Sequence, residues 1–110
     1  MSQLSAYNIM WIQVLFDLPV VEDRDRKAAT KFRNNLLDLG FKMVQFSVYQ
    51  RFCPSKDISE TFIKHVETII PENGSVHILS FTDKQYENII SYHGKKKKKQ
   101  EKTPEQYELF

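Results

Sequence analysis

Apolar residues form a short and almost continuous run from Trp11 to Phe16, which only Gln13 interrupts. A run of this length, followed by Asp17 and stopped by Pro19, is typical of a central strand that is buried on both faces. The first predicted element is therefore a strand that ends in a carboxylate.

The pattern then changes to helical spacing. A stripe of apolar side chains predicts a helix from Arg24 to about Leu39 that packs one face on a sheet; the stripe consists of Ala28, Ala29, Phe32, Leu36 and Leu39. Asp23 is the predicted N-cap of this helix, and Gly40 is expected just beyond its last turn.

Residues 43–52 alternate between the two faces of a strand, which predicts one extended segment. In that strand the side chains of Val44, Phe46 and Val48 would meet the helix, and those of Gln45, Ser47 and Tyr49 would point the other way. A hairpin bent within this segment is the alternative that the pattern leaves open.

A second helix is predicted from about Asp57, where Asp57 and Glu60 have the spacing of a capping box. Its apolar stripe comprises Ile58, Phe62, Ile63, Val66 and Ile70. The helix would end before Pro71, and Ser75–Phe81 would form the next strand. Residues 85–92 fit either a fourth strand or a helical turn.

This order of elements predicts an α+β fold, namely a ferredoxin-like sandwich with an antiparallel sheet and two helices on one face. The other face would carry many apolar side chains, and it is too apolar to be left in contact with water. We therefore expect a homodimer through that face. The expected members of the face are Trp11, Leu15, Gln45, Ser47 and Tyr49, together with His77, Leu79 and Phe81 or the alternate residues of that strand.

Composition supports a folded, single-domain protein of the cytoplasm. The 110 residues are 41% hydrophobic and 13% aromatic, which suits one core and argues against a disordered chain. No run approaches the roughly 18 apolar residues of a membrane helix, so no membrane partner is expected. The first residues lack the features of a signal peptide, and the lone Cys53 fits a reducing compartment.

The net charge of +2 is unevenly distributed along the chain. Before residue 94, ten basic residues face eleven acids, whereas residues 95–102 contain six lysines. The sequence thus predicts a ferredoxin-like domain over residues 1–92, a basic flexible linker over 93–106 with no structure in the Lys95–Lys99 run, and an apolar docking end over 107–110. Tyr107, Leu109 and Phe110 would make the docking contacts.

Asp17 is the candidate catalytic and metal-binding residue. It shares strand parity with Trp11 and Leu15, so it should lie at the rim of the expected dimer face. A twofold axis there would bring two Asp17 carboxylates together, and two such hard oxygen ligands could hold Mg²⁺ weakly, with most of its waters retained. The alternative is that Asp17 caps the turn that follows it.

Other familiar catalytic patterns are missing from the sequence. His65, His77 and His93 have no metal-ligand spacing to one another or to Cys53. There is no nucleophile-elbow serine, and three glycines leave little room for a phosphate-binding loop. Conventional hydrolases, kinases and dinucleotide-binding enzymes are therefore disfavoured.

The first helix carries a basic cluster that is a candidate nucleic-acid-binding surface, made of Arg24, Arg26, Lys27, Lys31 and Arg33. An ordinary solvated helix face, balanced by Asp25 and Asp38, is an equally good interpretation. In a dimer the cluster would occur twice, which favours an elongated polyanion such as duplex DNA.

Over residues 9–92 the sequence resembles the small CRISPR-associated adaptation protein, the second of the two near-universal Cas proteins. The resemblance rests on Phe16-Asp17-Leu18-Pro19, on the basic helix that reaches Phe32-Arg33, on Leu39-Gly40-Phe41, and on the segment from Gln45 to Tyr49. The stretch Phe81–Asn88 is similar to the version that accompanies the Cas-nine effector.

The resemblance implies a ferredoxin-like homodimer that bridges CRISPR integrase dimers and binds the duplex captured as a new spacer. It also implies a Mg²⁺-dependent phosphodiesterase centre at the aspartate of the first strand, which corresponds to Asp17. Two alternatives remain open, namely a toxin-like metal-dependent endoribonuclease of the same fold and an RNA-binding domain of the RRM kind. The second would need a basic-Gly-aromatic strand motif, and Gln50-Arg51-Phe52-Cys53 lacks the glycine.

Overall fold

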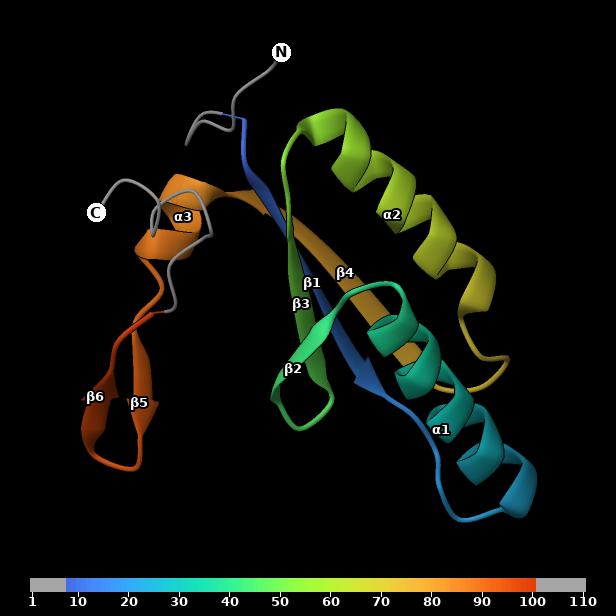
Figure 1. The fold of residues 1–110 in the computed structure, drawn as a ribbon. Helices are drawn as coiled ribbons and strands as arrows, with labels where there is room; N and C mark the ends of the chain where they lie inside the picture. The colour runs from blue at the N-terminus through green and yellow to red at the C-terminus, as the bar shows by residue number, and fades with distance from the viewer. Residues whose placement is uncertain (1–7, 101–110) are drawn as a thin grey trace.

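The structure, a computed structural model, describes residues 8–100 (Figure 1). Along the chain its elements are β1 (Met10–Asp17), α1 (Asp23–Asp38), β2 (Lys42–Gln45), β3 (Val48–Cys53), α2 (Lys56–Ile69), β4 (Ser75–Thr82), α3 (Asp83–Glu87), β5 (Ser91–His93) and β6 (Lys96–Lys98). The first strand and the long helices thus form where the hydrophobic pattern predicts them.

Four strands make one sheet in the order β2-β3-β1-β4, and every neighbouring pair is antiparallel. Because β3 lies between β1 and β2, those two strands run parallel and α1 is the crossover that joins them. Helices α1 and α2 lie on the same side of the sheet in Figure 1. This arrangement confirms the predicted α+β ferredoxin-like sandwich.

The main core lies between the sheet and the two long helices. Ile12 and Val14 of β1 are fully buried there against Phe32 and Leu36 of α1 and Val66 of α2. The rings of Phe16 and Phe32 meet edge to face, with 5.1 Å between their centroids, a favourable aromatic geometry. The alternate residues of β1 point to the opposite face of the sheet, which has no long helix over it.

The prediction of one strand over residues 43–52 is wrong, and the hairpin left open as the alternative is the structure that forms. β2 and β3 are joined by a turn at Phe46 and Ser47, and Ser47 adopts a φ of 63°. Phe46 is therefore 89% exposed instead of meeting α1. The turn also changes which residues share a face, so Tyr49 packs in the main core against Phe16.

Both predicted N-caps are displaced. Asp23 is the first residue of α1, after Glu22 as N-cap, and its carboxylate pairs with Arg26. In α2 the N-cap is Ser55, whose hydroxyl accepts a hydrogen bond from the backbone N–H of Ile58 at 3.2 Å. A serine that reaches the third residue of a helix satisfies one of its free N–H groups, so the expected box of Asp57 and Glu60 is not formed.

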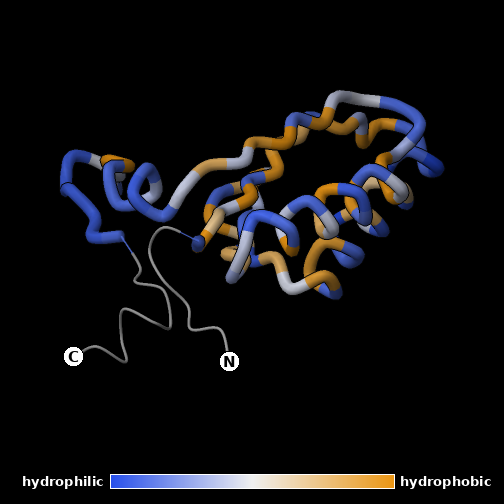
Figure 2. The backbone as a smooth tube through the Cα atoms, turned by 90° about the horizontal axis from the view of Figure 1, so that it is seen from above, coloured by the Kyte–Doolittle hydropathy of each residue, from blue (hydrophilic) through white to orange (hydrophobic). Residues whose placement is uncertain are grey.

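Residues 83–100 form an arm that leaves the end of β4. It comprises α3 and then a two-stranded hairpin of β5 and β6. The hairpin lies apart from the two long helices, α1 and α2, in Figures 1 and 2. The expectation that the Lys95–Lys99 run has no structure is wrong, because Lys96–Lys98 pairs with Ser91–His93. Gly94, at a φ of 62°, supplies the left-handed backbone for the turn.

None of the helices among residues 8–100 is both long enough and apolar enough to cross a membrane.

Candidate functional site

Asp17 is the last residue of β1 and its side chain is exposed. It pairs across the sheet with Ser75, the first residue of β4. The turn before β4 packs tightly on this strand end, since a Cβ at Gly74 would lie 2.7 Å from the Asp17 carbonyl oxygen. Only a residue without a side chain fits there, so Gly74, at a φ of 99°, helps to fix the position of Asp17.

The Asp17 carboxylate makes no hydrogen bond or ion pair with any residue from 8 to 100. The backbone of residues 18–20 therefore does not use it as a cap, which was the alternative role for this side chain. Within the same range, no group of three His, Cys, Asp or Glu side chains could hold a metal ion. One chain thus offers a single free carboxylate at this point.

The open face of the sheet, on which Asp17 lies, is covered at one end and bare at the other. At the far end of β1, Trp11 is 6% exposed because Tyr86 of α3 stacks on it at 3.7 Å. Towards Asp17, Gln13 donates a hydrogen bond to Gln50 at 3.1 Å, and Leu79 is 45% exposed. The bare part of this face therefore adjoins the candidate catalytic residue.

The membership of this face differs in part from the prediction. The cross-strand pairs place Val48, Gln50 and Phe52 of β3 beside β1 residues of the open face, in place of the expected Ser47 and Tyr49. His77, Leu79 and Phe81 of β4 lie there as expected. The β2–β3 turn causes the difference, because a shift of one residue moves every side chain of a strand to the other face.

The five basic residues predicted on α1 do not form one uniform surface. Lys27 and Lys31 are exposed and stand one helical turn apart, so they share a face. Together with Arg26, Thr30, Asn34 and Asn35 they line a shallow groove along the helix. Arg24 is exposed and lies 4.0 Å from Glu22, a distance at which an exposed ion pair contributes little.

Arg26 and Arg33 differ from the two lysines because their guanidinium groups have partners within the chain. The Arg26 guanidinium donates to the backbone oxygens of Val20 and Val21 at 3.1 and 3.0 Å and also pairs with Asp23. Arg26 thus fixes the loop between β1 and α1. Arg33, which is half-buried, donates to the Thr30 hydroxyl at 3.4 Å. Lys27 and Lys31 are left as the members of the cluster that have no partner among residues 8–100.

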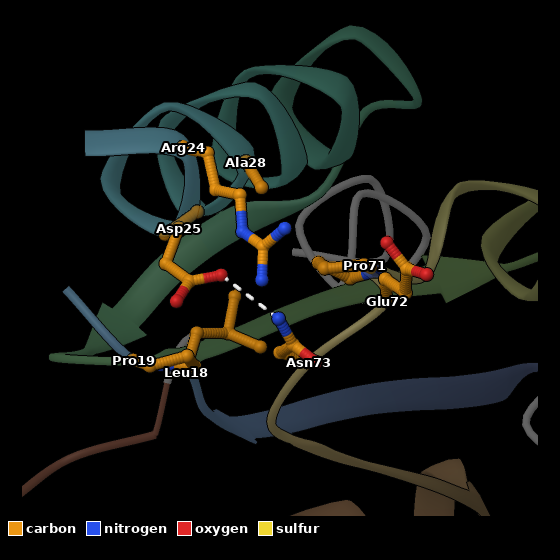
Figure 3. A pocket seen from close by; sticks show the side chains of 9 residues that line it. Leu18, Pro19, Arg24, Asp25, Ala28, Pro71, Glu72 and Asn73 are labelled. Atoms are coloured by element: carbon orange, nitrogen blue, oxygen red, sulfur yellow. Dashed lines mark hydrogen bonds between the residues drawn. The ribbon is translucent and has the colours of Figure 1, made fainter. Parts of the chain in front are cut away.

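A pocket of about 220 Å³ opens next to the loop that follows Asp17 (Figure 3). Its wall comes from three segments, namely Leu18 and Pro19, the start of α1, and the turn before β4. Asn73 donates a hydrogen bond to Asp25 at 3.0 Å across it. Sequence reasoning did not find this pocket, because its segments are far apart in the chain and no motif joins them.

Sequence reasoning also missed Arg51 and Asp83. Arg51 of β3 donates to the carbonyl of Leu39 at the end of α1 and stacks on the Phe62 ring, 3.8 Å from its centroid. Asp83 is fully buried and accepts a hydrogen bond from the Trp11 indole at 2.8 Å. Both connect residues distant in sequence, which no local pattern reveals. The predicted docking residues Tyr107, Leu109 and Phe110 lie outside the described residues.

Comparison with known proteins gives consistent matches over most of the chain. The family model described as CRISPR associated protein Cas2 matches residues 10–89. A protein of Paracidovorax avenae named CRISPR-associated endoribonuclease Cas2 is 53% identical over 107 residues, which are 97% of this chain and 99% of the relative. A protein of the same name from Flavobacterium psychrophilum is 41% identical over 109 residues, 99% of this chain and 95% of that relative.

Proposed function

The chain belongs to the family of CRISPR associated protein Cas2, and on that premise we propose that it is a metal-dependent endoribonuclease that acts as a homodimer. The observation that carries the proposal is the exposed Asp17 carboxylate at the bare end of the open sheet face. The proposal also follows the relatives, since both of those described above are named endoribonucleases.

The dimer is inferred from the open sheet face. Leu15, Val48 and Leu79 place apolar surface beside Asp17, and a second copy that packs there would remove it from water. A twofold interface uses the same surface on both subunits, so Asp17 of each chain would lie at the rim of the same interface. This is how a site with one carboxylate per chain obtains two.

The donor set at Asp17 fits a divalent cation such as Mg²⁺. A carboxylate oxygen is a hard ligand, and Asp17 is not occupied by any partner within residues 8–100. Mg²⁺ usually keeps several waters and binds through one or two carboxylates together with phosphate oxygens. Two Asp17 side chains would therefore hold it weakly, and a nucleic-acid phosphate would complete the site. When bound, the cation would polarise a phosphoryl oxygen of the scissile bond.

The residues of the chain itself would bind and orient the RNA. Lys27 and Lys31 carry exposed charges on one face of α1, where they can contact phosphates. Arg26 holds the loop from Val20 to the start of α1. That loop begins directly after Asp17, so Arg26 supports the position of the candidate catalytic group without contacting the substrate.

The test is hydrolysis of a labelled single-stranded RNA by the purified dimer, with Mg²⁺ and with EDTA. We expect cleavage by the wild-type protein in Mg²⁺ alone and none by Asp17→Ala. The matched control is Asp38→Ala, which removes an exposed carboxylate at the other end of α1 and should leave cleavage unchanged. Equal cleavage by the wild type and Asp17→Ala would assign the activity to another site or to a contaminant.

A second function, binding of duplex DNA during spacer acquisition, is favoured by the exposed Lys27 and Lys31. A dimer presents this pair twice, which suits a duplex that spans both subunits and is shared with the CRISPR integrase. Each phosphate contact contributes about 0.9 to the slope of log affinity against log salt concentration. A duplex that spans both subunits would lose four contacts in the dimer of Lys27→Glu with Lys31→Glu, so that slope should flatten by about 3.6. An unchanged slope would show that α1 is not the DNA-binding surface.

A further inference from the structure

The β5–β6 hairpin carries the largest uncompensated charge of the described chain. Lys95–Lys99 adds five positive charges, and no aspartate or glutamate occurs between Asn88 and Gln100. The hairpin lysines are all exposed. No residue from 8 to 100 forms an ion pair with them. This charge stands apart from the body of the protein, where basic and acidic residues nearly balance.

The β5–β6 pairing holds these charges in fixed positions. Lys96, Lys97 and Lys98 pair in register with His93, Tyr92 and Ser91. Its return strand is tied back to the body of the arm, because the Gln100 amide donates to the carbonyl of Tyr86 at 3.1 Å and Ser91 donates to Gln100 at 3.2 Å. Five like charges would repel one another in a flexible segment, so their pairing in a strand keeps them on one projecting element.

An exposed aromatic ring accompanies the lysines. Tyr92 is 62% exposed, although an aromatic side chain of this size gains from burial. Tyr92 and Lys97 are direct cross-strand partners, so both side chains emerge on the same face of the hairpin. A flat apolar ring next to a cation is the combination that holds an unpaired base and its phosphate.

From these observations we propose that the β5–β6 hairpin is a second nucleic-acid-binding element, which holds single-stranded nucleic acid by stacking a base on Tyr92 while the lysines contact the phosphates. This element is separate from Asp17 and from the Lys27–Lys31 surface of α1. It favours unpaired strands over a blunt duplex, because the bases of a duplex are already stacked on one another. Binding here needs no metal ion.

The experiment measures the affinity of the full-length protein for a fluorescent single-stranded DNA of about 16 nucleotides, a length that spans one such binding site. EDTA is present throughout, so hydrolysis does not contribute and the result is independent of the function proposed for Asp17. Tyr92→Leu should weaken binding by about tenfold, in line with the loss of one stacked base. Tyr92→Phe keeps the ring and should bind within about twofold of the wild type.

The lysines are tested by the salt dependence of the same binding. Lys97→Gln with Lys98→Gln should reduce the slope by about 1.4 if both contact phosphates, since each contact to a single strand contributes about 0.7. The matched control, Lys56→Gln with Lys64→Gln, removes two exposed charges from α2 and should change the slope little. All these side chains are exposed, and circular dichroism with Trp11 fluorescence checks that the variants stay folded.

The outcomes are decisive for the hairpin. If the hairpin and control pairs give equal slopes, the lysines only add general charge and the proposal is wrong. If Tyr92→Leu binds the single strand as tightly as Tyr92→Phe does, no base stacks on this ring. The same conclusion follows if Tyr92→Leu weakens binding of a blunt duplex as much as binding of the single strand. If single-stranded DNA binds all variants equally, the hairpin does not hold the strand and the proposal is overturned.

Discussion

Replacement of Tyr86 by alanine should release the C-terminal arm without unfolding the body. Tyr86 is 2% exposed, and its ring lies nearly parallel to that of Trp11, with an angle of 9° between the planes. The same small cluster contains Ile9, with Phe52 and Phe81 packed against it. None of these residues belongs to the main core between the sheet and the two long helices.

The size of the effect follows from what the ring contacts. Truncation of a buried aromatic side chain to alanine costs about 3–5 kcal/mol in a packed core, and the stacked pair itself contributes about 0.5–1.5 kcal/mol of that. The arm is also held by the hydrogen bond from the Trp11 indole to Asp83 and by the bond from the Asp83 backbone N–H to the Ile9 carbonyl. A loss of about 3–5 kcal/mol raises the ratio of open to docked arms by about two to four orders of magnitude, so the open arm should become detectable.

Trp11 is the only tryptophan of the chain and the arm packs on it, so in a protein that stays folded its fluorescence reports on the docking of the arm. In Tyr86→Ala its emission should shift to longer wavelength and acrylamide should quench it more strongly, while far-ultraviolet circular dichroism changes little. Tyr86→Phe keeps the stacked ring and is the matched control, with emission close to that of the wild type. Unchanged Trp11 emission in Tyr86→Ala would refute the idea that this contact docks the arm.

Two further predictions concern Cys53 and the C-terminus. Burial raises the pKa of the Cys53 thiol above its ordinary value of 9.0, and nearby Arg51 offsets part of this. The folded protein should therefore resist iodoacetamide at pH 8 until denaturant is added, and rapid labelling of the native protein would contradict the buried position. Its stability should fall as the pH rises above about 9, because the thiol of the unfolded chain ionises first. Deletion of residues 107–110 should weaken association with a second copy or with the integrase and leave the body folded, and a pull-down of unchanged yield would rule out a docking role for Tyr107, Leu109 and Phe110.

The hydrophobic pattern was sufficient for the elements that are long and locally consistent. The buried run that ends at Asp17 became β1, and the stripe through Phe32 and Leu36 became the packed face of α1. In both cases neighbouring residues carry the signal, because burial of one face dictates the spacing of apolar side chains. The sheet order then follows from short connections and right-handed crossovers.

The errors arose where a single residue overrides the pattern. Ser47 takes a left-handed conformation that glycine or asparagine normally adopts. Residues 43–52 contain neither of these, so no local signal predicted the turn. The pairing of Lys96–Lys98 with Ser91–His93 was not predicted, because a run of like charges is typical of an unstructured segment. The contact of Trp11 with Asp83 joins residues 72 positions apart, and only the folded chain brings them together.

The place of Asp17 on the open sheet face, at the end of β1, was predicted from strand parity. Among residues 8–100, no group of three His, Cys, Asp or Glu side chains gathers there. The different roles of the basic residues on α1 were harder to predict. All five residues have the same charge, but Arg26 is used by the loop before α1 whereas Lys27 and Lys31 face solvent. Those roles depend on where the loop passes, which spacing along a helix does not encode.

The most direct test of the account is the activity of mixed dimers. Wild-type and Asp17→Ala chains are unfolded together in equal amounts and refolded, so random pairing gives about one quarter wild-type dimers. If two Asp17 carboxylates form one site, Mg²⁺-dependent RNA cleavage per total chain should be about one quarter of the wild-type value. Cleavage at about one half would mean that each chain acts with its own Asp17 alone, and this result would contradict the shared site.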